Sequence, residues 1–73
     1  MTIVPIHGEY ITLGQFLKIT DIISSGGQAK SYLADAVIHV NGEPDNRRGR
    51  KLYPGDKVRV LHAGEFLIEA EPG

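Results

Sequence analysis

The sequence contains no cysteine and no tryptophan, and only 7% of its 73 residues are aromatic. The lack of cysteine excludes disulfides and cysteine-ligated zinc sites, and it fits a reducing compartment. No apolar run approaches the length of a transmembrane helix, and the first residues lack the basic stretch of a signal peptide. We therefore expect a cytoplasmic protein that forms one domain over residues 1–73 and does not enter a membrane.

Motifs of catalysis are also missing. The three histidines, His7, His39 and His62, lie far apart and do not form an HxxxH or HExxH pair. The sequence contains no nucleophile elbow, no Walker loop and no GxGxxG segment. We therefore expect no catalytic residue, no metal ligand and no cofactor, and the protein is not expected to be an enzyme.

Basic residues are few but concentrated. The net charge of −1 argues against a nucleic-acid partner, yet four of the eight basic residues fall within five positions, and residues 46–53 include no acid. These four are Arg47, Arg48, Arg50 and Lys51. A polyanion responds to the local potential within roughly 10 Å at moderate salt, so this loop matters more than the total charge.

Two short helices are predicted, joined by a turn at residues 24–27. Thr12 with Gln15, and then Ser25 with Gln28, have the spacing of a capping box at a helix start. After each of these pairs, side chains recur at the spacing of one helix face. The first face consists of Leu13, Phe16, Leu17 and Thr20, and the second consists of Ala29, Tyr32, Leu33 and Ala36.

After Ala36 the periodicity becomes that of β-strands. Residues 37–40 form a β-branched strand, and Asn41-Gly42 is a strong hairpin signal. Pro44 confines the return arm to a sheet edge. Residues 57–61 and 66–68 predict two more strands, and residues 3–6 and 10–11 predict an edge pairing. This order predicts an α+β fold in which two short packed helices lie against a small, bent antiparallel sheet.

The segment from Tyr10 to Val60 resembles the S4 RNA-binding domain. The matching features occur in the family's order and spacing: Leu13 with Phe16-Leu17, then Ser25 with Gln28-Ala29-Lys30, then Val37 to Gly42, then Pro54 to Val58. The short chain is most similar to the small stand-alone bacterial members, of the YaaA type. The resemblance implies an S4-like fold, also called the αL RNA-binding motif. It also implies a non-enzymatic protein that recognises structured RNA, either ribosomal or transfer RNA.

Three positions depart from the family's pattern. Thr12-Leu13-Gly14 stands where members often have Arg-Leu-Asp, and Ser25-Gly26 stands where many have Ser-Arg. Both departures remove positive charge from the expected RNA surface. Many members end the second helix with glycine, where this chain has Ala36. A left-handed alanine costs on the order of 1 kcal/mol, so we expect this helix to end with a different geometry.

We expect the RNA surface to combine the second helix with the basic loop. The loop from Arg47 to Lys51 is expected to lie at the surface as a flexible cationic clamp, because the planar fork of arginine suits phosphate. Glycines at the helix start would let a phosphate approach free N–H groups. The candidate RNA-binding residues are Lys18, Gly26, Gly27, Gln28, Lys30, Arg47, Arg48, Arg50 and Lys51.

Alternative roles stay open for these features. Gly26-Gly27 also suits a tight turn, Gln28 also suits a helix cap, and Tyr53 either stacks on a base or packs beside a turn. For the whole protein, one alternative is a protein-interaction adaptor that has kept the fold and lost RNA affinity. Another is a DNA-binding protein, because two helices joined by a tight turn resemble a helix-turn-helix. We expect a monomer.

Overall fold

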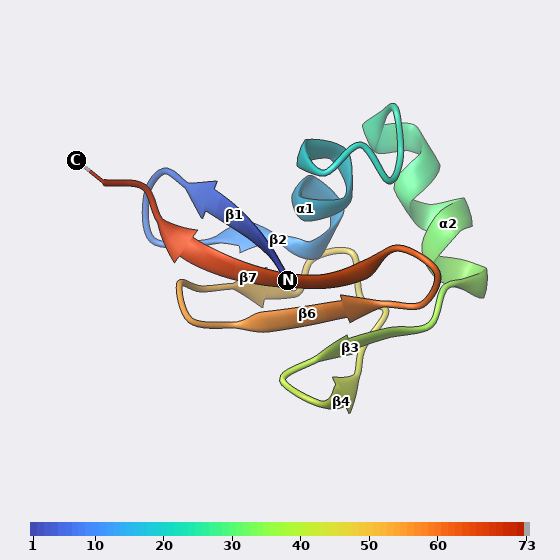
Figure 1. The fold of residues 1–73 in the computed structure, drawn as a ribbon. Coiled ribbons are helices and arrows are strands. Elements are labelled where there is room, and N and C mark those ends of the chain that lie inside the picture. Colours follow the sequence, from blue (N-terminus) through green and yellow to red (C-terminus); the bar gives the residue numbers. More distant parts are fainter. Residues whose placement is uncertain (73) are drawn as a thin grey trace.

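The computed structural model describes residues 1–72, in which a pair of helices packs against a bent sheet (Figure 1). The expected α+β class is confirmed. In chain order the elements are β1 Thr2–Ile6, β2 Ile11–Thr12, α1 Leu13–Ile19, the 3₁₀ turn η1 Gly26–Gln28, α2 Ala29–Asp35, β3 Ile38–Val40, β4 Glu43–Pro44, β5 Lys51–Leu52, β6 Lys57–Val60 and β7 Gly64–Ala70.

Helix α1 begins at the predicted capping box. The backbone N–H of Gln15 donates to Thr12 Oγ1 at 3.2 Å, and the N–H of Thr12 donates to Gln15 Oε1 at 2.8 Å. These bonds satisfy backbone donors that a helix start otherwise leaves without partners. The buried face of the helix contains Leu13, Phe16 and Leu17, as the spacing predicted.

Helix α2 follows the single turn η1, and Gln28 organises this start. Its Oε1 accepts the backbone N–H groups of Ser24 at 2.7 Å and Ser25 at 3.1 Å, together with the Ser24 hydroxyl at 2.8 Å. The helix ends at Ala36, whose φ of −77° and ψ of 145° are extended. The expected departure from a left-handed cap is therefore confirmed.

The large sheet has the strand order β1-β7-β6-β3-β4. The pairs β3–β4, β3–β6 and β6–β7 are antiparallel, as expected. β1 instead runs parallel to β7, with Thr2 opposite Phe66, so the sheet is mixed rather than purely antiparallel. The long connection between β1 and β7 includes both helices, and crossovers of this length permit parallel pairing. β2 and β5 form a separate antiparallel pair, the β2–β5 ribbon.

The core lies between the helices and one face of the sheet. Phe16 of α1 is fully buried, and its ring lies 5.1 Å from that of Phe66 in β7 at an interplanar angle of 85°. This edge-to-face geometry is favourable for aromatic rings and fixes α1 on the sheet. In β6, Val58 and Val60 face the core, whereas Lys57 and Arg59 are exposed on the outer face.

The predicted hairpin turn joins β3 to β4, the edge strand that contains Pro44. Asn41 and Gly42 have φ values of 53° and 85°, which is the left-handed backbone that a tight hairpin requires. The Asn41 side chain also donates to Asp56 Oδ1 at 3.1 Å and accepts the N–H of Lys57 at 3.0 Å. These bonds join the hairpin turn to the turn that precedes β6.

Candidate nucleic-acid interface

The loop between β4 and β5 bridges the two helices. The backbone N–H groups of Leu13 and Gly14 donate to the carbonyls of Arg50 and Arg48, at 2.8 and 2.9 Å. On the other side of the loop, Asn46 Nδ2 donates to the carbonyl of Leu33 at 3.5 Å. Leu33 lies in the last turn of α2, where backbone carbonyls lack partners within the helix. Two backbone bonds to α1 and one side-chain bond to α2 therefore hold the loop, which argues against the flexible clamp that its glycine suggested.

Asp45 lies just before the basic run and forms ion pairs with two of its arginines, Arg47 and Arg50. Arg47 donates to its carboxylate through Nε at 3.1 Å and Nη2 at 2.9 Å, and Arg50 Nη1 donates at 2.9 Å. The Asp45 side chain is only 8% exposed. Hydrogen bonding from the Arg47 side chain is the largest cause that lowers the Asp45 pKa, and further bonds add to it against the opposing effect of burial. Asp45 therefore stays ionised near neutral pH.

Arg50 contradicts the expectation that all four basic residues are surface groups. Its side chain is 28% exposed, whereas that of Arg47 is 69% exposed. Arg50 lies inward because its guanidinium pairs with the almost buried carboxylate of Asp45. Two of the four charges are thus partly neutralised by an acid that lies just outside the acid-free segment considered in the sequence.

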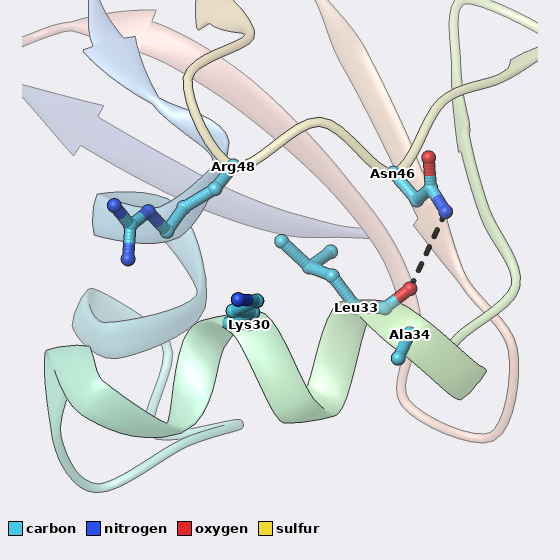
Figure 2. A pocket seen from close by; sticks show the side chains of 5 residues that line it. All are labelled: Lys30, Leu33, Ala34, Asn46 and Arg48. Carbon is cyan, nitrogen blue, oxygen red and sulfur yellow. Dashed lines mark hydrogen bonds between the residues drawn. The ribbon is translucent and has the colours of Figure 1, made fainter.

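Arg48 makes no such pair and crosses the start of α1. A Cβ built on Gly14 would lie 2.7 Å from Arg48 Cγ, which is closer than real Cβ contacts. Glycine at position 14 therefore makes room for the stem of Arg48. Figure 2 shows Arg48 reaching from the loop over α1, with Lys30 standing on the neighbouring helix α2.

Two shallow depressions meet at Arg48. One lies between the loop and α2 and is lined by Lys30, Leu33, Ala34, Asn46 and Arg48 (Figure 2). The other extends to α1, where Arg48 is joined by Lys18, Gly26 and Gly49. Within residues 1–72, no carboxylate lies within 4.0 Å of the charged nitrogens of Lys18, Lys30 or Arg48. Three cations without acidic partners, Lys18, Lys30 and Arg48, therefore line two adjoining depressions. We call these three residues, together with Gly26, the Arg48 surface.

The remaining predicted residues lie elsewhere or have structural partners. Gln28 caps the start of η1 and lines a different depression, with Asp21 and Ser31. Gly27 is exposed but lines neither depression at Arg48. Arg47 and Arg50 bind Asp45, and Lys51 lies over the ring of Tyr10, with Nζ 5.0 Å from its centroid.

Sequence reasoning missed Gly14, Asp45 and Asn46. Asp45 gave a usable signal, because an acid two residues before an arginine is within reach of its guanidinium. Gly14 gave a weaker one, since glycine inside a helix is unfavourable and often has a packing reason. Asn46 gave none, because its partner Leu33 is separated from it along the chain.

The described residues contain neither a metal-binding cluster nor a membrane-spanning helix. Across the described residues, no group of three or more His, Asp or Glu side chains is placed to hold a metal ion. His7 instead contacts Glu71, with Nδ1 2.8 Å from the carboxylate. In the same part of the chain, no helix is both long and apolar enough to cross a membrane.

Comparison with known proteins adds two findings. The family model described as the S4 domain matches residues 4–69. The chain is also 55% identical over 65 residues to the "Probable ribosome maturation protein RlbA" of Bacillus subtilis (strain 168), an alignment that covers 89% of this chain and 92% of that protein. The family match extends beyond the segment that the sequence motifs marked, because it includes the greater part of β1 and of β7.

Proposed function

Because the chain belongs to the S4 domain family, we propose that it is a non-enzymatic protein that binds structured RNA through the Arg48 surface. The observation that carries this proposal is the convergence of Lys18, Lys30 and Arg48, from two helices and a loop, on adjoining depressions. None of the three is engaged by an acid within the described residues. Their charge is therefore available to an external anion.

The chemistry of this surface suits the RNA backbone. The deep major groove of A-form RNA is closed to side chains, so proteins contact its phosphates, 2′-hydroxyls and unpaired bases. Arg48 offers a planar fork for two phosphate oxygens, whereas Lys18 and Lys30 act as point charges. The backbone bonds that hold the loop fix the start of the Arg48 side chain, which lowers the entropy lost on binding.

We further propose that the RNA is ribosomal RNA in a maturing particle, so that the protein acts in the cytoplasm. The support is the similarity to the Bacillus subtilis protein, which is named as a probable ribosome maturation protein. Transfer RNA is the competing ligand. Crosslinking the protein to RNA in cells and sequencing the recovered RNA separates the two, and a recovery dominated by transfer RNA would contradict the ribosomal assignment.

The binding experiment is a titration of structured RNA at several salt concentrations. Three phosphate contacts predict a log–log salt slope of about −2 to −3, and Arg48→Ala should reduce its magnitude by about one. Arg59→Ala is the matched control, because it removes the same charge from an exposed residue of β6 on the outer face of the sheet. Equal losses in the two variants would contradict the assignment of the Arg48 surface.

Two further outcomes would favour the competing hypotheses. RNA binding that is negligible at every salt concentration would favour a protein-interaction adaptor on this fold. Equal affinity for duplex DNA of matched length would favour a DNA-binding protein. In either case the three cations would need a different partner.

A further inference from the structure

The exposed face of the β2–β5 ribbon carries an aromatic pair. Ile11 is paired with Leu52 and Thr12 with Lys51, and Ile11 and Leu52 are buried. Continuing this register places Tyr10 opposite Tyr53. Because successive strand residues point to opposite faces, both tyrosines lie on the face away from the core.

The two rings form a continuous exposed area. Their centroids are 5.6 Å apart with an interplanar angle of 47°, and the residues are 39% and 46% exposed. Lys51 Nζ lies 5.0 Å from the centroid of Tyr10, within the range of a cation–π contact. An aromatic surface flanked by a cation is therefore presented to solvent.

This area adjoins the Arg48 surface. Gly49 lines the depression that contains Lys18 and Arg48, and it also lines a separate one with Lys51 and Tyr53, which we call the Tyr53 depression. Arg47, whose side chain is 69% exposed, also lines the Tyr53 depression. A strand leaving the Arg48 surface across Gly49 would thus meet Tyr53 directly.

We propose that Tyr53, with Tyr10 behind it, is a stacking platform for an unpaired nucleobase next to the RNA element that the Arg48 surface holds. The inference rests on the proposed function and extends it to a preferred ligand, a structured RNA with a single-stranded flank or bulge. The flat face of any base can stack on a tyrosine, so the platform selects unpaired RNA rather than a sequence. Lys51 then lies beside the phosphates of that nucleotide.

Asp56 also lines the Tyr53 depression, but its carboxylate already accepts two hydrogen bonds. Asp56 Oδ2 accepts the backbone N–H of Tyr53 at 2.8 Å, and Oδ1 accepts from Asn41 Nδ2 at 3.1 Å. These bonds fix the backbone of Tyr53 at the end of β5. Asp56 therefore helps to position Tyr53 for stacking.

The test uses three labelled hairpin RNAs: one with a blunt end, one with a short single-stranded extension, and one with the same extension made of abasic nucleotides. The last two carry equal phosphates and differ only in bases. For the unaltered protein, the extension with bases should bind about fivefold or more tightly than the abasic one, the lower end of the range for stacking one base. Tyr53→Ala should abolish this difference, and Tyr53→Phe should retain it.

The failures of the two proposals give different results. If Arg48→Ala weakens binding of all three hairpins but the extensions with and without bases bind equally well, the platform is refuted and the Arg48 surface stands. If the blunt hairpin does not bind, or binds independently of Arg48, both proposals fail. The comparison of extensions uses the unaltered protein, so it does not depend on how well a Tyr53 variant folds.

Discussion

Arg48 lies so close over Gly14 that any side chain at position 14 would meet its stem. A Cβ there would be 2.7 Å from Arg48 Cγ and 3.4 Å from the Arg48 carbonyl oxygen. The backbone N–H of Gly14 also donates to that carbonyl. Glycine at position 14 therefore has a physical role, because it leaves room for the Arg48 side chain.

Gly14→Ala should therefore displace Arg48 while leaving the fold intact. Alanine favours the helix by about 1 kcal/mol over glycine, which offsets part of the crowding. We expect a small change in melting temperature and weaker binding to structured RNA. In a double-mutant cycle, Gly14→Ala should have little further effect once Arg48→Ala is present, with a coupling free energy of about 1 kcal/mol. Additive losses would show that Gly14 acts on RNA by another route.

Arg50→Ala and Arg48→Ala should differ in their effect on the stability of the fold. Arg50→Ala removes a partner of the almost buried Asp45 carboxylate, so we expect a loss of roughly 1–2 kcal/mol in the free energy of unfolding. Arg48→Ala removes a group without an acidic partner and should change it by less than about 0.5 kcal/mol. Urea denaturation of both variants measures this. The prediction is wrong if the two variants unfold at the same urea concentration.

Asp45 should make stability depend on acidic pH. Its pKa in the folded protein lies below the ordinary value of 3.8, chiefly because of the hydrogen bond from the Arg47 side chain. The unfolded chain therefore binds the proton more readily, and the contribution of Asp45 is complete above pH 3.8 and decreases as the pH falls below it. Asp45→Asn should remove this part of the pH dependence and cost roughly 1 kcal/mol at neutral pH, a modest value because Arg47 is solvated. Thermal melts between neutral and acidic pH compare the two proteins, and parallel curves would contradict the assignment.

Gly26→Ala should affect binding and spare the fold. No heavy atom lies within 4 Å of a Cβ built there, and its φ is not in the left-handed region. Alanine is therefore expected to leave stability unchanged or raise it by about 0.4–1 kcal/mol. If a phosphate approaches the backbone beside Lys18 and Arg48, the added methyl group should weaken RNA binding. Unchanged RNA binding in Gly26→Ala would show that Gly26 is not part of the Arg48 surface. Gly49 also lies in open space, so Gly49→Ala in the same titration tests the boundary between the Arg48 surface and the β2–β5 ribbon.

Local signals predicted the helices and the hairpin. Thr12 with Gln15 marked the start of α1, and Asn41-Gly42 marked the turn, because each signal depends on backbone groups only a few residues away. The parallel pairing of β1 with β7 was not predicted, since residues 3–6 alternate in the same way in either direction. Strand direction is decided by the intervening chain, which includes both helices.

The candidate site was predicted less completely than the fold. Charge clustering identified Arg48, and the helical pattern placed Lys30 on an exposed face. Neither signal distinguished Arg48 from Arg47 and Arg50, because that difference depends on which guanidinium reaches Asp45. Contacts between side chains of a loop are set by its backbone path, which the positions of Leu13 and Gly14 determine here.

The pairing of β1 with β7 also bears on when the protein can fold during synthesis. β1 leaves the ribosome before both helices and the other strands of its sheet, whereas β7, the strand beside it, emerges after all of them. Val4 and Ile6 of β1 belong to the core, so these hydrophobic side chains stay exposed to solvent until β7 has been synthesised. We expect a chain truncated before Gly64 to lack a cooperative melting transition, because β1 then has no strand to pair with.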